Sequence, residues 1–184
     1  MASAELRSDT RRILVYGVTG SGKTWLAEQL SRVTGIEWHA VDDLTWEPGW
    51  VAVPMDEQRR RIEAICSQPE WILDSAYGDW LDIPLAHSAL VVALDYPRWF
   101  SLQRLLRRTV ARLVDRQPTC NGNRETLREL VKRDSIIVWH FTSFSRKHRR
   151  IARWTVDPAG PSVVRLTSAR QTETWLAGLG SSVR

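Results

Sequence analysis

The sequence predicts an α/β fold, in which a mostly parallel sheet carries helices on both of its faces. Short apolar runs typical of buried strands alternate with segments of helical periodicity along the chain. The first of these strands leads through a glycine-rich loop straight into a helix. The 184 residues are enough for one domain with a full hydrophobic core, so we expect a single domain over 1–184.

The composition excludes several classes of protein. No apolar run approaches the roughly 20 residues of a membrane helix, and residues 1–12 lack the apolar stretch of a secretion signal. Cys66 and Cys120 cannot build a disulfide framework, so a reducing compartment is expected. We therefore expect a cytoplasmic protein, monomeric or homodimeric, that has no membrane partner.

The first strand and helix lie on either side of the glycine-rich loop. Residues 13–16 form a short apolar run that Gly17 ends, which is typical of a buried strand. Apolar side chains recur at helical spacing over 23–33, and Gly35 is a typical helix stop. A second strand is expected over 36–41, directly before an acidic pair.

A loop, a helix and a third strand follow. The turn signal Pro48-Gly49 lies in a segment, 44–54, that is expected to be a loop. A helix over 54–66 begins at one proline and is closed by Pro69, and the apolar run 71–73 is the third strand.

The second half of the chain repeats the strand and helix order. Proline and glycine signals separate its elements, and a polar break over 115–123 interrupts two basic helical stretches. The expected elements are a strand over 89–94, helices over 97–113 and 124–150, a strand over 162–166 and a closing helix over 171–179.

The net charge of +5 is unevenly distributed. Residues 98–153 hold 15 basic and 4 acidic residues, a net charge of +11, so the rest of the chain carries −6. Such a block suits a polyphosphate or a nucleic acid, although solvated helix faces would also account for it. No zinc-finger or helix-turn-helix pattern is present, so nucleic-acid binding lacks a reading module.

The glycine-rich loop carries the most specific motif. Residues 17–24 read G-V-T-G-S-G-K-T and fit G-x-x-x-x-G-K-[ST] at every fixed position. Backbone N–H groups of such a loop cradle phosphates, while Lys23 reaches the β- and γ-phosphates and the Thr24 hydroxyl binds Mg²⁺. ATP and Mg²⁺ are therefore the expected cofactors. The residues expected to bind the nucleotide here are Gly17, Thr19, Gly20, Ser21, Gly22, Lys23, Thr24 and Trp25.

Acidic side chains follow three of the strands, at the sheet edge where ligands of α/β proteins bind. We expect Asp74 to hold Mg²⁺ through water, and Asp42 to orient or deprotonate an acceptor. Turn or cap roles are the alternatives for both. Asp95 precedes Tyr96-Pro97 and is interpreted as a helix start.

Aromatic residues surround these carboxylates in the sequence. Trp46 and Trp50, in the expected loop, and Tyr77 are candidates for a wall that binds the acceptor. Trp71 lies inside a strand, where core packing is expected.

Arginines supply the expected lid. Arg104 and Arg108 share a helix face, and a lid over about 113–150 would close over the nucleotide and exclude water. Arg108, Arg112 and Arg170 are candidates for binding the nucleotide, and Arg124 for binding the acceptor. Further arginines of this part of the chain are Arg107, Arg116 and Arg128.

The pattern as a whole resembles the adenylate-kinase-like P-loop kinases, and especially the small bacterial DNA topology modulation (FlaR-like) proteins. Besides the loop, the matching stretches are V-D-D-L-T-W-E-P-G-W at 41–50, W-I-L-D-S-A-Y at 71–77, L-D-Y-P-R at 94–98 and N-G-N-R-E at 121–125. The family has D-G-N-Y where this chain has Asp74-Ser75-Ala76-Tyr77, so an asparagine that could touch the acceptor is missing.

The resemblance implies a three-layer nucleoside-monophosphate-kinase fold with a five-stranded parallel sheet of order 2-3-1-4-5 and a helical lid. It implies ATP use, an acceptor-binding region over about 42–80, Asp74 near Mg²⁺, and Arg104 with Arg108 as the R-x-x-x-R pair of such kinases. The expected activity is transfer of the γ-phosphoryl group of ATP to a nucleotide or other small molecule. The alternative is an ATP-binding regulatory protein or ATPase that acts on DNA topology or on a protein partner.

Overall fold

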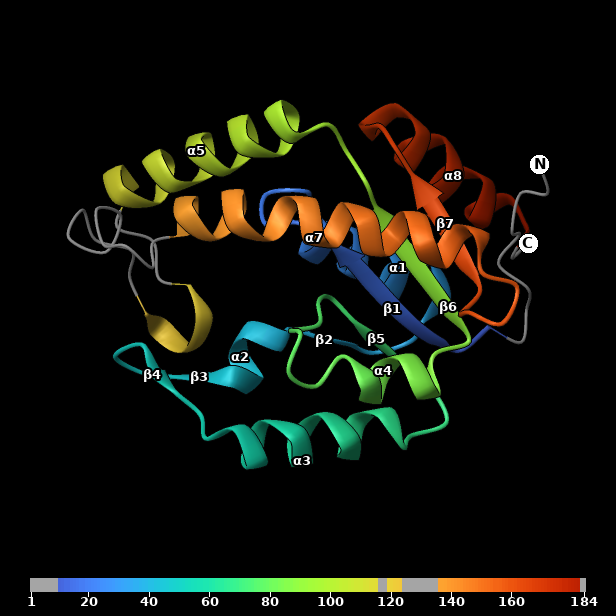
Figure 1. The fold of residues 1–184 in the computed structure, drawn as a ribbon, viewed down its shortest axis with the longest axis horizontal. Coiled ribbons are helices and arrows are strands. Elements are labelled where there is room, and N and C mark those ends of the chain that lie inside the picture. Colours follow the sequence, from blue (N-terminus) through green and yellow to red (C-terminus); the bar gives the residue numbers. More distant parts are fainter. Residues whose placement is uncertain (1–9, 116–118, 124–135, 183–184) are drawn as a thin grey trace.

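A five-stranded parallel sheet forms the centre of the molecule (Figure 1). The computed structural model describes residues 10–115, 119–123 and 136–182. In spatial order the strands are β2 (Trp38–His39), β5 (Trp71–Leu73), β1 (Arg12–Gly17), β6 (Leu90–Leu94) and β7 (Val163–Leu166). Numbered within this sheet alone, their order is 2-3-1-4-5, which confirms the expected fold class.

Helices cover both faces of the sheet and make it the middle of three layers. In Figure 1, α7 crosses in front of the strands with α3 and α4 below it, whereas α1 lies behind. The described helices are α1 (Lys23–Thr34), α2 (Val41–Thr45), α3 (Met55–Cys66), α4 (Asp82–His87), α5 (Arg98–Asp115), the short 3₁₀ turn η1 (Cys120–Gly122), α7 (Ile136–Val156) and α8 (Ala169–Ser182).

Side chains of β1 point alternately to the two faces of the sheet and so contribute to both halves of the core. Leu14 and Tyr16 point to the face covered by α3, α4 and α7, and Ile13 and Val15 point to the face covered by α1 and α8. All four side chains are buried. The central strands are buried on both faces, so β5, β6 and the part of β1 after Arg12 are continuous apolar runs, whereas the edge strands β2 and β7 are partly exposed.

The segment after the second strand differs from the prediction. The expected strand over 36–41 is only two residues long, because the Val41 N–H donates to the Asp74 carboxylate and the chain turns into α2. Part of the expected loop over 44–54 is a small antiparallel hairpin of β3 (Trp46–Glu47) and β4 (Val51–Ala52). Gly49, with φ 83°, forms the turn between them.

Several helices also differ from the prediction. The sequence did not predict α4, in which Pro84 occupies the first turn, where proline is tolerated. The basic helix expected over 124–150 is described as α7 and extends to Val156, because Ile151 and Trp154 pack into the core. Residues 124–135 of the expected helix lie outside the described residues.

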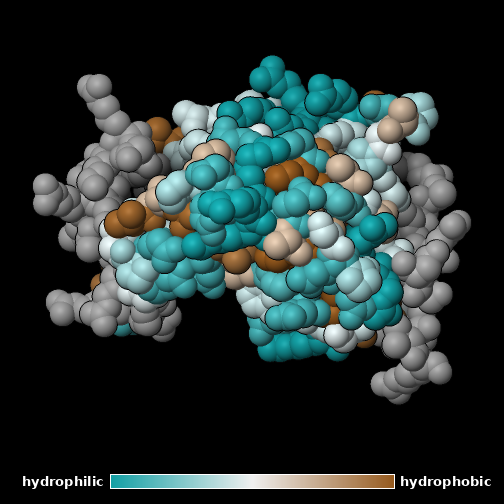
Figure 2. Space-filling view, turned by 90° about the horizontal axis from the view of Figure 1, so that it is seen from below, coloured by the Kyte–Doolittle hydropathy of each residue, from teal (hydrophilic) through white to brown (hydrophobic). Residues whose placement is uncertain are grey.

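The face seen from below in Figure 2 is mostly hydrophilic, with small apolar patches, and its outline is notched between the left end of the molecule and the main body. Within the described residues, no helix is both long and apolar enough to cross a membrane.

Candidate active site

The glycine-rich loop between β1 and α1 adopts a backbone that requires glycine. Gly20 and Gly22 have φ of 82° and 93°. A Cβ atom on Gly20 would come within 2.3 Å of the Ser101 carbonyl oxygen, so α5 packs directly against the loop. At Gly22 a Cβ atom would lie 3.2 Å from the guanidinium of Arg104. The loop is therefore closely enclosed by α5.

Three consecutive carbonyl oxygens of the loop each bond a side-chain nitrogen: Gly17 bonds Lys147 at 3.0 Å, Val18 bonds Lys23 at 3.1 Å, and Thr19 bonds His140 at 3.1 Å. Because a carbonyl oxygen only accepts, Nδ1 of His140 carries the proton of that bond. In a trans peptide the following N–H points the opposite way. The loop thus directs its carbonyls toward these side chains and the N–H groups of the same peptides away from them.

The N-terminus of α1 continues this arrangement. Gly22 occupies the N-cap position and no side chain caps the helix. The first N–H groups of a helix lack partners within the helix and favour an anion. Together with the ammonium group of Lys23, these N–H groups form a positive cradle of the kind that polyphosphates require.

Asp74 follows β5 and lies against the start of α1. Its carboxylate accepts bonds from the Thr24 hydroxyl at 2.7 Å and from the Val41 N–H at 2.9 Å. Burial raises the pKa of Asp74, and these two hydrogen bonds offset part of that rise. A hydroxyl and a carboxylate in contact provide the oxygen ligands that Mg²⁺ prefers. The described residues contain no group of three or more His, Cys, Asp or Glu side chains that could hold a metal ion by themselves, so water and phosphate oxygens would complete such a site.

Asp42 is the exposed carboxylate of the site. It lies in the first turn of α2, and the Tyr77 hydroxyl donates to its Oδ1 at 2.5 Å. Burial raises the pKa of Tyr77, and so does the neighbouring charge of Asp42. Burial also lowers the pKa of Lys23, and the charges of Asp74 and Asp42 oppose that shift. The ammonium group of Lys23 therefore interacts electrostatically with both carboxylates.

A cavity of about 180 Å³ adjoins the loop on the side of α8. Four of the predicted site residues line it: Ser21, Gly22, Trp25 and Arg104. Arg170 is exposed and is not among the lining residues. The remaining lining residues are Leu26, Leu94, Tyr96, Ala169, Thr172 and Glu173. Its position beside the loop and its mixed apolar and polar lining suit a nucleotide base.

The hairpin that carries the predicted aromatic wall is held by a segment distant in sequence. The rings of Trp46 and Trp50 meet edge to face, with centroids 5.9 Å apart. Asn123 is buried, and its side-chain oxygen accepts bonds from the N–H groups of Gly49 and Trp50 at 2.7 and 2.9 Å. Its amide nitrogen donates to the Glu47 carbonyl at 3.1 Å.

Asn121 binds the same region. Its side-chain amide donates to the carbonyls of Asp43 and Trp46 at 2.8 and 2.6 Å. Asn121 has φ 49°, a conformation that asparagine tolerates better than most residues. Trp50 has φ 58°, so the hairpin turn is strained at one non-glycine residue. The N-G-N segment, residues 121–123, is thus hydrogen-bonded along the hairpin of β3 and β4.

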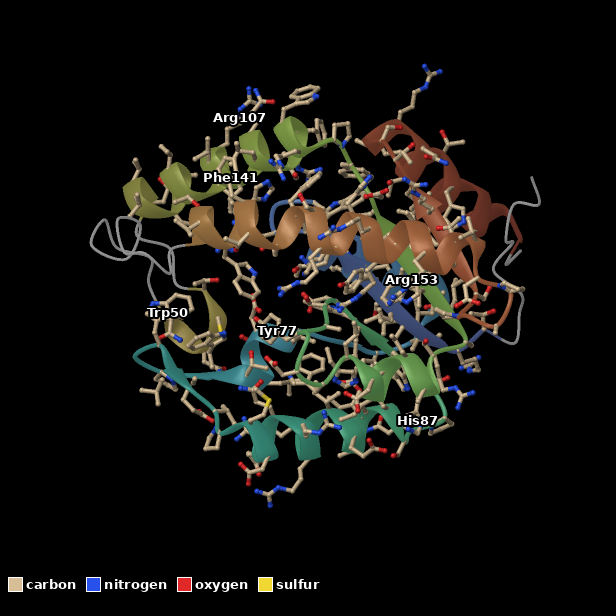
Figure 3. All side chains as sticks on the ribbon, viewed as in Figure 1. Trp50, Tyr77, His87, Arg107, Phe141 and Arg153 are labelled. Atoms are coloured by element: carbon tan, nitrogen blue, oxygen red, sulfur yellow. The ribbon has the colours of Figure 1, made fainter. Side chains whose placement is uncertain are left out.

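The remaining predicted residues fall into two groups. On α5, Arg108 contributes to the electrostatic field at Lys23, Arg112 is half-buried one turn further on, and Arg107 is exposed and labelled in Figure 3. Arg116, Arg124 and Arg128 lie outside the described residues. Asp95 does not serve as a simple helix start, because its carboxylate bonds His148 at 2.7 Å and Arg165 at 2.8 Å.

Sequence reasoning missed His140, Lys147 and the clamping roles of Asn121 and Asn123. The chain has only three lysines among its 26 basic residues, so a lysine in an arginine-rich helix was a usable signal for Lys147. The two asparagines belong to the N-G-N-R-E motif at 121–125, but the sequence alone assigned them no role. His140 carried no sequence signal.

The comparisons show the fold. No family model and no curated protein match the sequence. Among solved structures, a gluconokinase from Sinorhizobium meliloti has a TM-score of 0.51 at 15% identity, covering 96% of this chain and 97% of that one. Shikimate kinase from Aquifex aeolicus has a TM-score of 0.52 at 14% identity, covering 94% of this chain and 95% of that one. Deoxyadenosine kinase from M. mycoides has a TM-score of 0.51 at 13% identity, covering 93% of this chain and 97% of that one. The chain therefore has the fold of P-loop kinases.

Replacing Asn123 tests the clamp. Asn123→Ala removes the oxygen that accepts from the N–H groups of Gly49 and Trp50, a loss of about 0.5–1.5 kcal/mol for each hydrogen bond. We expect hydrogen exchange at these two amides to accelerate at least about tenfold. Gln103→Ala, at an exposed position of α5, should leave both rates unchanged. Unchanged exchange in Asn123→Ala would show that the hairpin holds its shape without the clamp.

Replacing Asp74 tests its buried charge. A pKa raised on folding means that the ionised carboxylate destabilises the folded protein above that pKa, and that this cost disappears below the ordinary pKa of aspartate. We expect Asp74→Asn to melt at a higher temperature than the unaltered protein at neutral pH, with the difference vanishing near pH of about 3.5. Thermal unfolding across this range measures it. A lower melting temperature at neutral pH would contradict the assignment.

Proposed function

We propose that this protein is an ATP-dependent phosphotransferase that moves the γ-phosphoryl group of ATP to a small-molecule acceptor. The observation that carries the proposal is the convergence, at one edge of the sheet, of an ammonium group, a hydroxyl and two carboxylates: Lys23, Thr24, Asp74 and Asp42. Phosphoryl transfer needs charge neutralisation, metal-binding oxygens and a group that orients the acceptor, and these residues supply all three.

The loop and the cavity beside it support the nucleotide half of the proposal. The N–H groups of the loop and of α1 bind the phosphates, and Lys23 leaves the Val18 carbonyl to neutralise the terminal ones. Thr24 and Asp74 would hold Mg²⁺, which neutralises charge on the β- and γ-phosphates when bound. The cavity against Trp25 and Tyr96 receives the base.

Asp42 and the hairpin of β3 and β4 support the part of the proposal that concerns acceptor binding. The Tyr77 hydroxyl donates to Asp42, in the manner expected of an acceptor hydroxyl. An acceptor that displaces Tyr77 gives its proton to Asp42 while its oxygen forms the new bond to phosphorus and ADP leaves. The paired rings of Trp46 and Trp50 provide an apolar wall that keeps water from competing.

The basic helices complete the proposal. Arg104 and Arg108 lie on the side of α5 that meets the loop, where guanidinium groups stabilise charge on the transferring group. We assign the acceptor to the region of 42–80 and a lid to 113–150 within one domain, as in the DNA topology modulation proteins that the motifs resemble. Free cysteines at Cys66 and Cys120 fit a reducing compartment such as the cytoplasm.

A coupled assay with a panel of acceptors tests the proposal. ADP release from MgATP should be stimulated by at least one nucleoside, nucleoside monophosphate, sugar or sugar acid. Lys23→Ala should reduce that rate by about 10²–10³-fold, because it removes the main positive side chain of the cradle. Arg32→Gln, an exposed position on the same helix, is the matched control and should retain full activity.

Two outcomes would contradict the proposal. If no acceptor raises ADP release above slow hydrolysis, phosphoryl transfer is excluded for that panel. If duplex DNA raises it instead, and the effect falls steeply with salt, the chain is an ATPase that acts on nucleic acid, consistent with its basic helices.

A further inference from the structure

Lys147 is a buried cation that the proposed transfer does not use. It projects from α7, is 7% exposed, donates to the Gly17 carbonyl at 3.0 Å and lies 5.2 Å from the centroid of the Tyr16 ring. Lysine is almost never fully buried unless it is paired. No carboxylate within the described parts of the chain forms an ion pair with it, and only one of its three N–H donors has a hydrogen-bond acceptor there.

The groups around Lys147 add positive charge. Arg150, one turn further along α7, donates to the Tyr16 hydroxyl at 3.0 Å, and Arg146 precedes Lys147 directly. Burial lowers the pKa of Lys147, and the charges of Lys23, Arg146 and Arg150 lower it further. The one carboxylate that raises it is that of Asp42. This group of cations is therefore uncompensated among the described residues.

The cation group lies on the acceptor side of the sheet. The Tyr16 ring beneath Lys147 belongs to the core cluster that contains Val41 and Trp80, next to Asp42 and Tyr77. The cavity for the base instead contains Leu94 and Tyr96, from the opposite core cluster. In Figure 3, Tyr77 lies below α7, on the side where Arg153 also projects.

We propose that Lys147, Arg150 and the Tyr16 hydroxyl form a subsite for an oxyanion of the acceptor, a phosphate monoester or a carboxylate. This inference rests on the proposed function and narrows it: the acceptor is an acidic small molecule, held by its anion under α7 while Asp42 holds the oxygen to be phosphorylated. Hydroxyl recognition and anion recognition are thus assigned to different elements, α2 and α7.

The energetics favour an anionic over a neutral acceptor. A buried ammonium without a counter-ion is costly, and an oxyanion that accepts from Lys147 and Arg150 forms the short, charge-assisted bonds that offset this cost. A neutral acceptor would cover the same cations without giving them a counter-ion, so the cost of burying their charge would remain. The Tyr16 hydroxyl accepts from Arg150 and retains its own O–H as a further donor toward the anion.

The terminal phosphate of ATP is the competing occupant, and titration with inorganic phosphate separates the two. Calorimetry is done on protein saturated with magnesium and a non-hydrolysable ATP analogue, so that the loop already holds a γ-phosphate. We expect inorganic phosphate to bind this complex, and acetate in a parallel titration to show whether a carboxylate also binds. Phosphate that binds in the presence of MgADP but not of the triphosphate analogue would overturn the proposal.

Variants locate the phosphate. Lys147→Met keeps the apolar stem and should weaken phosphate binding at least tenfold, and Arg150→Gln should weaken it several-fold. Arg149→Gln, exposed on the outer side of the same helix, is the matched control and should change it less than twofold. Equal losses in Arg149→Gln and Arg150→Gln would overturn the subsite. Because Lys147→Met could disturb folding, Arg150→Gln decides the test if the melting temperature of Lys147→Met falls.

Failure of this inference is distinguishable from failure of the proposed function. If the ATP analogue does not bind, the proposed function fails, and phosphate is then titrated into Lys23→Ala without nucleotide. Phosphate should still bind Lys23→Ala and should be lost in Lys23→Ala/Lys147→Met. Loss of phosphate binding in Lys23→Ala alone would place the anion on the glycine-rich loop and refute the subsite.

Discussion

The orientation of three peptide groups in the glycine-rich loop is the constraint on which the rest of the site depends. Nitrogen atoms of Lys147, Lys23 and His140 bind the carbonyls of residues 17–19. The N–H group of each of these peptides consequently points away from the nitrogen that its carbonyl binds, and the uncapped end of α1 adds further N–H groups. Close packing of α5 against Gly20 leaves no room there for a side chain and further restricts the loop.

The two carboxylates of the site are structurally dependent on each other. By accepting the Val41 N–H, Asp74 ends β2 early and starts α2, which brings Asp42 to the edge of the sheet. Asp74 is buried and each of its two carboxylate oxygens accepts a hydrogen bond, whereas Asp42 is exposed and its carboxylate, within the described residues, accepts one bond, from Tyr77. This difference in environment suits a fixed metal-side carboxylate and an exchangeable acceptor-side one.

Much of the fold could be predicted because its signals are local. The apolar periodicity of β1 and α1 and the glycine motif between them depend on neighbouring residues only. The clamp between Asn123 and the hairpin could not be derived in this way, because it joins side-chain amide to backbone groups 73 and 74 residues away. The rarity of lysine distinguishes Lys147 in the sequence, but its burial could not be predicted, since a basic residue in a basic helix is normally solvated and only packing shows that this one is buried.

The tethering of the loop by α7 also bears on how the protein is made. The bonds from His140 to Thr19 and from Lys147 to Gly17 span 121 and 130 residues. During synthesis the motif emerges from the ribosome early, long before its tethers exist, and closing so long a stretch of chain is slow. A nascent chain that ends before α7 would carry every residue of the motif without the bonds from α7 to its carbonyls, so this form of the loop is reached only after α7 has been synthesised.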